Sequence, residues 1–364
     1  MIVKEVTAVL EELAPLTYAE DFDNVGLLVG SYTQEVIGVL VTLDTLENVV
    51  DEAIEKKCNL IISFHPIIFS GLKSITGSTY VERVVIKAIK NNIAIYSMHT
   101  ALDNSKEGVS AKICEVLDII NPKILIPQKS TIKKLTTYVP LNTAEQLKNA
   151  LFEAGAGNVG NYSNCCFTSQ GIGSFKADKH AKPTIGTIGE THFEEEVQIN
   201  ITFSASVEKE VMNALFKNHP YEEVAYEVIS LENANQNIGM GMIGTLKKPM
   251  GENDFLKLVK KRMNASGIRH SKLLNKEIEK VAVLGGSGAF AIQAAKVVGA
   301  DIFITADVKY HQFYEADDKM VIADIGHFET EQFTKNLLVD YLTKKIPNFA
   351  IRLSESITNP IKYL

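Results

Sequence analysis

Short apolar runs and helical apolar spacing alternate through the first third of the chain. In residues 3–13, the apolar side chains at positions 3, 6, 10 and 13 share one face of a helix. The runs that follow have the length and composition of strands that are buried on both faces of a parallel sheet. The expected strands are residues 36–43, 60–64 and 93–98, and the helices between them are residues 46–57 and 79–91. This order predicts parallel strands joined by right-handed crossovers.

The same alternation of expected strands and helices returns in the last third of the chain. The expected strands are residues 280–284, 301–305, 319–325 and 349–353, and the expected helices are residues 289–298 and 329–343. Two stretches with one pattern at opposite ends of a chain are most simply the two halves of one domain. We therefore predict an α/β domain of residues 1–130 and 236–364, with a mostly parallel sheet or sheets flanked by helices.

The middle of the chain has a different order of elements. The expected sequence is a strand at 135–139, a helix at 143–154, strands at 165–175 and 196–203, a helix at 206–218 and a strand at 225–231. Thr143 with Gln146 predicts a capping box at the first helix, and Ser206 is the expected cap of the second. The order βαββαβ is typical of a ferredoxin-like fold. We predict that residues 131–235 form an inserted ferredoxin-like α+β domain.

Composition narrows the class of protein. A length of 364 residues favours two domains, and 46% hydrophobic with 22% charged residues is typical of globular chains. The net charge of -7 argues against a nucleic-acid surface, which is normally basic. The four cysteines contain no CxxC pair, as expected for reduced thiols in the cytoplasm. No signal peptide and no apolar run of membrane-spanning length is recognised, so we expect a cytoplasmic protein without a membrane anchor.

Three histidines stand at the ends of expected strands. His65 follows the run 60–64, His99 follows residues 93–98, and His327 follows residues 320–326. Ligands of open α/β sheets gather beyond the carboxyl ends of the strands. A single histidine in such a place is more often an ordinary polar residue than a ligand. Three of them together favour a shared metal site.

Two of these histidines have a carboxylate four residues later. Asp103 follows His99 and Glu331 follows His327, a spacing that places both side chains on one face of a helix. The segment after Asp103 is also compatible with a loop. Imidazole and carboxylate together suit Zn, Mn, Fe or Ni better than Mg or Ca. Carboxylates can bridge two ions about 3.5–4 Å apart, and such pairs activate water for hydrolysis.

Other polar features have more ordinary explanations. Residues 285–288, Gly-Gly-Ser-Gly, follow a strand and could cradle phosphate, although a tight turn explains them equally simply. Asp307 is a candidate for supporting a ligand, for facing a substrate or for capping a helix. Asp44 is expected to be a helix cap. His180, His192 and the segment 219–223, His-Pro-Tyr-Glu-Glu, are expected on the surface or in turns.

Five segments together carry a family pattern. They are residues 23–27 (DNVGL), 64–69 (FHPIIF), 99–103 (HTALD), 305–311 (TADVKYH) and 324–331 (DIGHFETE). The chain resembles the Nif-three-like (NGG-one-interacting factor three) family, whose bacterial members are often named GTP cyclohydrolase 1 type 2 homologs. The middle of the chain, with the segment 219–223, is similar to the CutA/PII-like domain inserted in the long bacterial form of this family.

The resemblance implies a dinuclear metal centre with two divalent ions per chain. It implies the ligands His65, Asp103, His327 and Glu331, with His99 and Asp307 as additional ligands or supporting residues. The family usually has two successive histidines before the proline, and this chain has Phe64 at the first of these positions. One metal position is then expected to be weaker, more open to water, or completed by His99. The resemblance also implies a toroidal homohexamer with the metal sites facing an internal cavity.

Two functions from different classes agree with these features. The leading hypothesis is a metal-dependent, GTP cyclohydrolase-like hydrolase that acts on a nucleotide-like or other small substrate. The alternative is a non-catalytic metal-binding protein with a regulatory or interaction role. A third hypothesis, nucleotide binding through residues 285–288, rests on the glycine-rich turn alone.

Overall fold

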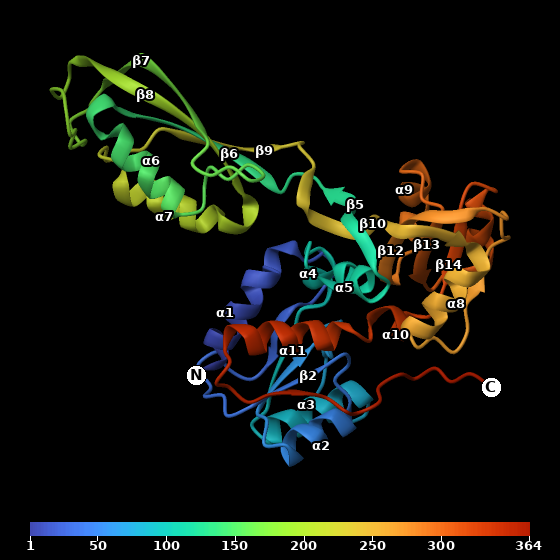
Figure 1. Ribbon diagram of the computed structural model, residues 1–364. Coiled ribbons are helices and arrows are strands. Elements are labelled where there is room, and N and C mark those ends of the chain that lie inside the picture. Colours follow the sequence, from blue (N-terminus) through green and yellow to red (C-terminus); the bar gives the residue numbers. More distant parts are fainter. The chain divides into compact units, whose positions relative to one another are not determined.

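The computed structural model describes all residues from 1 to 364, and the chain divides into two compact units (Figure 1). Unit 1 consists of Met1–Pro127 and Gln236–Leu364, and unit 2 consists of Gln128–Asn235. Residues 1–130 with 236–364 and residues 131–235 were predicted to be separate domains, and their independent folding remains a prediction. None of the helices combines the length and the apolar character needed to cross a membrane.

The first sheet of unit 1 has five strands in the order β1-β4-β3-β2-β15. Strands β2, β3, β4 and β15 are parallel, and β1 is an antiparallel edge strand. Helices α2 and α3 pack on one face of this sheet, and helices α1 and α11 pack on the other. The elements are α1 (Val3–Leu13), β1 (Gly26–Val29), β2 (Val39–Thr42), α2 (Glu47–Glu55), β3 (Leu60–Ser63), α3 (Tyr80–Lys90), β4 (Ala94–Ser97), α11 (Thr334–Lys345) and β15 (Ile351–Leu353).

The second sheet of unit 1 has six strands in the order β11-β14-β13-β12-β10-β5. Strands β12, β13 and β14 are parallel, whereas β10 runs antiparallel to β12 and β11 runs antiparallel to β14. One large apolar core joins this sheet to the first, because side chains from β2, β3, β13 and β14 all belong to it. The elements are α4 (His99–Asp103), α5 (Val109–Val116), β5 (Ile119–Gln128), β10 (Asn235–Gly251), α8 (Glu252–Arg262), β11 (Arg269–His270), β12 (Glu277–Ser287), α9 (Ile292–Val297), β13 (Ile302–Ala306), β14 (Val321–Asp324) and α10 (His327–Glu331).

Unit 2 is a four-stranded antiparallel sheet with two helices on one face (Figure 1). The strand order is β7-β8-β6-β9. Alternate residues of β6 and β8 pack against the helices, so the sheet has one apolar face and one face without helices. The elements are β6 (Ile132–Pro140), α6 (Ala144–Glu153), β7 (Cys166–Lys176), β8 (Thr191–Ser204), α7 (Glu208–Asn218) and β9 (Tyr226–Leu231). The mixed α/β fold with several sheets flanked by helices therefore agrees with the fold class expected from the sequence.

Three local predictions were wrong. The helix expected at 329–343 is divided into α10 and α11, because the chain leaves α-helical hydrogen bonding near Gln332 and Phe333. Thr143 does not cap α6, since its hydroxyl donates to the carbonyl oxygen of Pro140 (3.2 Å). Ser206 lies within a short 3-10 segment before α7 and is not a cap; the Ser204 hydroxyl instead accepts from the Ser206 amide.

Candidate metal centre

Two of the predicted histidines leave the first sheet at adjacent strand ends. His65 comes two residues after β3, and its amide donates to the carbonyl of Leu43 (2.9 Å). His99 opens α4 two residues after β4, and its amide donates to the carbonyl of Phe64 (2.9 Å). Because these backbone bonds continue the ladder between parallel strands, both imidazoles are held at the carboxyl edge of the sheet. Their ring centroids are 5.3 Å apart.

His327 and Glu331 come from the second sheet. They begin and end the one-turn helix α10, which follows β14 through Gly326 at φ 100°. The left-handed backbone at this glycine turns the chain sharply from the strand into the helix. The spacing of four residues brings Nε2 of His327 to 3.2 Å from Oε2 of Glu331. The helix predicted from this spacing is present.

Histidines from both sheets converge on one carboxylate. His65, His327 and Glu331 form a group, which we call the metal group, whose potential ligand atoms all lie within 4.8 Å of one another. Nε2 of His65 is 3.2 Å from Oε2 of Glu331, the same oxygen that His327 approaches. This oxygen is buried and has no hydrogen-bond partner. A buried, poorly satisfied oxygen between two imidazole nitrogens fits a site for a cation.

A carboxylate behind each imidazole fixes the ring. Nδ1 of His65 is 2.8 Å from Oδ1 of Asp44, and Nδ1 of His327 is 2.7 Å from Oδ2 of Asp307. Asp307 also accepts a hydrogen bond from the hydroxyl of Ser287. Carboxylates in this position hold the proton on Nδ1 and leave Nε2 for a metal ion. Asp307 is thus a supporting residue, and the expected capping role of Asp44 was wrong, because no side chain caps α2.

The ionisation of the group shows how strongly it attracts positive charge. Burial lowers the pKa of His65, but Asp44 and Glu331 outweigh burial and raise that pKa to about 10. Burial likewise lowers the pKa of His327, and Glu331 with Asp307 raises it to about 9. Burial raises the pKa of Glu331, yet the two imidazoles hold it at about 2. The imidazoles and the carboxylates thus favour each other's charged forms, and a bound metal ion would compete with protons for the same nitrogen and oxygen atoms.

Asp103 lies near this group but outside the 4.8 Å set. It ends α4, and burial raises the pKa of its carboxyl well above the usual value. The nearby carboxylates of Glu331 and Asp23 raise this pKa further, whereas His65 and His327 lower it. Because the raised pKa favours the protonated carboxyl, Asp103 would ionise readily only beside an added positive charge such as a metal ion.

His99 is likewise outside the 4.8 Å set, and its partner is Asp23. Nδ1 of His99 is 2.8 Å from Oδ1 of Asp23. The other oxygen of Asp23 accepts from the Thr100 amide (3.0 Å) and hydroxyl (2.5 Å). Burial raises the pKa of Asp23, but the bonds from His99 and Thr100 outweigh it and hold that pKa at about 2. Asp23 was not predicted as a site residue, although it belongs to the family segment 23–27.

Phe64 occupies the position where the resemblance implies a histidine. Its side chain is fully buried in the core that joins the two sheets. Its ring centroid lies 4.9 Å from that of His65 and 5.5 Å from that of His99. Phe64 therefore packs against both imidazoles and contributes no ligand atom.

Comparison with known proteins identifies the relatives of the chain. The model of the family described as Duf34/NIF3 (NGG1p interacting factor 3) matches residues 1–360. The chain belongs to the Duf34/NIF3 family. A Bacillus subtilis protein named GTP cyclohydrolase 1 type 2 homolog is 39% identical, over 99% of this chain and 98% of that protein.

Solved structures agree with this assignment. A Bacillus cereus protein described as related to NIF3 is 36% identical, with a TM-score of 0.86 over 100% of this chain and 99% of its own. A Staphylococcus aureus protein is 29% identical, with a TM-score of 0.79 over 100% of this chain and 99% of its own. The family resemblance stated from the sequence is confirmed.

In this Duf34/NIF3 chain the glycine-rich turn supports the metal group. The amide of Gly286 donates to the hydroxyl of Thr330 (2.9 Å), so it is not free to bind phosphate. A Cβ on Gly286 would lie 2.4 Å from Oε1 of Glu331, and its φ of 66° favours glycine. The glycine thus allows β12 to approach α10 closely. This packing accounts for the turn without a bound nucleotide.

The histidines of unit 2 lie in different surroundings. His180 is exposed, and His192 is half-buried with Nε2 3.0 Å from Oε2 of Glu194. His219 is buried, and its Nε2 is 2.9 Å from the carbonyl oxygen of Tyr138. His219 thus lies in the expected turn after α7 but not on the surface, and it attaches the end of α7 to β6.

Proposed function

We propose that this Duf34/NIF3 protein binds two divalent metal ions and is a metal-dependent hydrolase for a nucleotide-like or other small substrate. The proposed ligands are His65, Asp103, His327 and Glu331. His99 is a further candidate ligand. The observation that carries the proposal is the approach of two imidazoles, from two different sheets, to one buried oxygen of Glu331.

The donor set suits Zn, Mn, Fe or Ni. Bound ions of this kind would activate water and polarise a substrate oxygen. The chain itself supplies orientation. Asp44 and Asp307 hold the two rings with Nε2 toward the centre, and Glu331 keeps its negative charge through the neighbouring imidazoles. Removing residues that orient metal ligands in this way typically lowers metal affinity by about 10- to 100-fold.

Two exposed aromatic side chains support a planar substrate. Phe22 and Phe69 are 66% and 51% exposed, with ring centroids 6.5 Å apart. The Phe69 ring centroid is 6.3 Å from that of His99. Exposed rings beside a metal group can stack on a heterocyclic base. The name GTP cyclohydrolase 1 type 2 homolog, borne by relatives, is compatible with a guanine nucleotide.

The organisation of the chain extends the proposal. We infer that unit 2 is an inserted ferredoxin-like, CutA/PII-like domain at residues 131–235; the βαββαβ order and the strand order β7-β8-β6-β9 support this. We also propose a toroidal homohexamer in the cytoplasm, on the basis of the family resemblance. Native mass spectrometry of the purified chain tests the assembly, and a monomer at micromolar concentration would contradict it.

Elemental analysis of protein purified without chelators tests the metal centre. We expect about two divalent ions per chain, bound tightly enough to survive gel filtration. A screen of purine and pyrimidine nucleotides, with GTP among them, then tests hydrolysis by the loaded protein. Absence of metal under several metal supplies would contradict the proposed centre, and loaded protein without turnover would contradict the enzyme.

Phe64 favours the second candidate function, a non-catalytic metal-binding protein with a regulatory or interaction role. Its apolar ring leaves one expected ligand position empty of donor atoms. Glu331→Gln separates the two functions. Loss of turnover with an intact assembly supports the enzyme, whereas collapse of the assembly on loss of metal supports a structural ion.

A further inference from the structure

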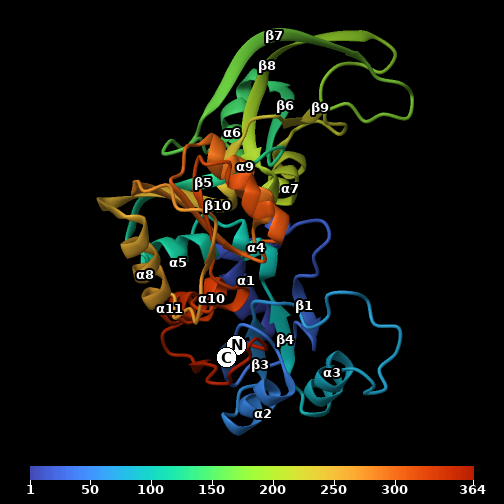
Figure 2. The same ribbon diagram turned by 90° about the vertical axis from the view of Figure 1, so that its right-hand side faces the viewer.

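Unit 2 contains a cavity of about 570 Å³ that is lined only by residues of this unit. It is formed on the face of the four-stranded sheet that the helices leave uncovered. Tyr138, Glu196 and Gln198 line it from the sheet, and these positions alternate with the core residues Val139 and Val197. The loop after β7 and the turn after α7 form the other walls. The loop is seen at the end of the β7–β8 hairpin in Figure 2.

Two glycines in β7 create the space. Gly171 pairs directly with Glu196 of β8, and a Cβ on Gly171 would meet nothing within 4 Å. A Cβ on Gly173 would lie only 2.1 Å from Oε2 of Glu196. The strand therefore has no side chains where the carboxylate of Glu196 lies over it. Side chains at both positions would fill this part of the sheet surface in an ordinary antiparallel sheet.

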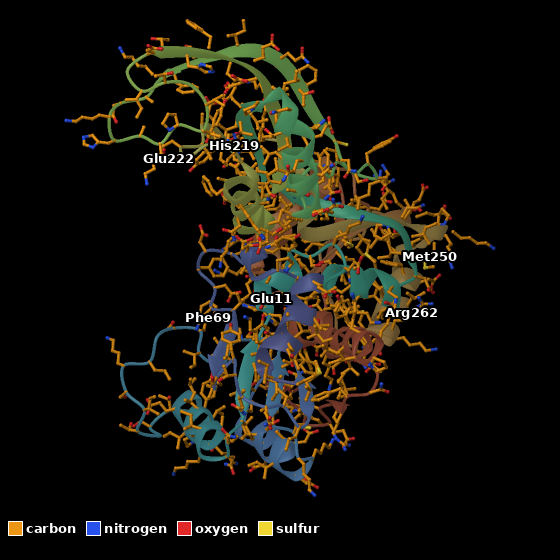
Figure 3. The ribbon with its side chains drawn as sticks, turned by 90° about the vertical axis from the view of Figure 1, so that its left-hand side faces the viewer. Glu11, Phe69, His219, Glu222, Met250 and Arg262 are labelled. Carbon is orange, nitrogen blue, oxygen red and sulfur yellow. The ribbon has the colours of Figure 1, made fainter.

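Hydrogen bonds hold the walls of the cavity together. The Lys182 amide donates to Oε2 of Glu222 (2.8 Å), and the Thr184 hydroxyl donates to the carbonyl of Pro220 (2.8 Å). These bonds attach the loop to the turn that follows His219, beside which Figure 3 shows Glu222. The Tyr221 hydroxyl then donates to Oε1 of Glu196 (2.8 Å). The loop, the turn and the sheet are thus joined around the cavity.

The lining is acidic and apolar. Its charged residues are three glutamates, at positions 196, 222 and 223, and it contains no lysine, arginine or histidine. Its aromatic residues are Tyr138, Phe175 and Tyr221, and its larger aliphatic residues are Ile172, Pro183 and Ile185. A carboxylate among apolar groups favours a cationic partner, and aromatic faces attract cations as well. The volume lies in the usual range for small-molecule sites.

We propose that this cavity binds a small organic cation, with an ammonium or guanidinium group at Glu196 and an apolar, preferably aromatic, body between Phe175, Tyr221 and the loop. Oε1 of Glu196 already accepts from Tyr221, so Oε2 is the atom that would receive the cationic group. The site uses only residues of unit 2. It does not depend on the metal ions or on the hydrolase function.

Three probes that share one aromatic body and differ in charge test this proposal. They are tryptamine, 3-ethylindole and indole-3-acetate, titrated into the full chain by calorimetry or by NMR. We expect tryptamine to bind at least about tenfold more tightly than 3-ethylindole, the scale of a charge-assisted hydrogen bond. Indole-3-acetate should bind most weakly. Equal affinity for tryptamine and indole-3-acetate would overturn the proposal.

Three substitutions locate the binding. Glu196→Gln keeps the shape and removes the charge, so tryptamine affinity should fall at least about tenfold. Gly171→Val places a side chain in the open space and should abolish binding of tryptamine. Thr168→Val lies on the same strand outside the lining and is the control, with unchanged affinity expected. Circular dichroism and thermal unfolding establish that each variant is folded. Full tryptamine binding by folded Gly171→Val would place the ligand elsewhere and refute the site.

Discussion

Carboxylates gather in both units of the chain, but different groups surround them. In unit 1, Glu331 lies between two imidazoles, and Asp103 adds a second acid nearby. In unit 2, Glu196 lies over two glycines and accepts a hydrogen bond from Tyr221. The first arrangement offers nitrogen and oxygen donors in a confined space. The second offers a cavity with apolar walls and no nitrogen ligand.

The difference follows from where each fold leaves its side chains. Strand ends of two sheets meet in unit 1, so side chains from distant segments converge and each ring is fixed by an acid behind it. Such convergence suits a small cation that is bound tightly. In unit 2 the site is the open face of one sheet, widened by Gly171 and Gly173. A broad face of this kind suits an organic ligand with a body as well as a charge.

Glu331→Gln should have the largest effect. The amide keeps the shape but removes the negative charge that both imidazoles approach. We expect metal affinity to fall by more than about 100-fold, which exceeds the loss typical for residues that only orient a metal ligand. Chelator competition measures the affinity, and elemental analysis measures the metal content.

The matched control for this substitution is Glu329→Gln. Glu329 is also buried in α10, but its carboxylate lies near Asn359 and is not part of the metal group. Metal content should remain unchanged in this variant. Equal loss of metal in both variants would mean that α10 is simply destabilised, and the contrast between a ligand and its neighbour would fail.

Metal removal should affect the two units differently. A ligand present at 100 times its dissociation constant stabilises the state that binds it by about 2.7 kcal/mol. Adding metal to stripped protein should therefore slow amide exchange in α10 and in the segment after β3 by up to about 100-fold. Exchange in the sheet β6–β9 should not change. Hydrogen exchange with mass spectrometry measures both regions, and a uniform change across both units would show that the metal acts on the whole chain.

The sequence predicted the central elements well because they carry strong periodic signals. Helix 3–13 was predicted with the bounds of α1, and the buried runs predicted β2, β3 and β4. Strands without an apolar run were missed for a physical reason. Strand β10 contains several glycines and a proline, and β11 has only two residues, so neither shows an apolar run. Their pairing is decided by neighbouring strands, which local periodicity does not describe.

The candidate site was predictable to a similar extent. Strand ends and the i, i+4 spacing pointed to His65, His327 and Glu331, which the structure brings together. Asp44 was not predicted as a partner of His65, because that contact depends on how the loop after β2 folds back. His219 was expected on the surface or in a turn, and it lies in the turn after α7. Its burial depends on packing against β6, which the sequence does not reveal.

Asp307→Asn should have a smaller effect than Glu331→Gln. Asp307 contacts Nδ1 of His327 but lies outside the metal group, so its loss should misorient the ring and not remove a ligand. We expect metal affinity to fall by about 10- to 100-fold, measured by chelator competition. Asp44→Asn removes the corresponding contact of His65 and should act similarly. The exposed Asp254→Asn is the control. A loss as large as that of Glu331→Gln would suggest that Asp307 itself binds metal.

Glu52→Gln should have the smallest effect, because this buried acid already has partners from the chain. Its carboxylate pairs with Lys56 (2.8 Å) and accepts from the Ser354 hydroxyl (2.7 Å). Two backbone amides, of Glu355 and Ser356, complete the shell. Burial raises the pKa of Glu52, but these bonds outweigh it and hold the pKa at about 2. Glu52 thus needs no cation from outside, in contrast with Glu331 and Glu196.

This pairing predicts how stability depends on pH. The pKa of Glu52 is lower in the folded state, so its contribution is present above the unfolded value of 4.5 and is lost as the pH falls from 4.5 toward 2. Glu52→Gln should lower the free energy of unfolding by about 1–2 kcal/mol at pH 7, a discounted figure because Lys56 is partly exposed. The difference from the unmodified protein should shrink by pH 3 in urea unfolding of metal-free protein. A difference that stays constant between pH 7 and pH 3 would mean that the charge of Glu52 is not what holds the C-terminal segment.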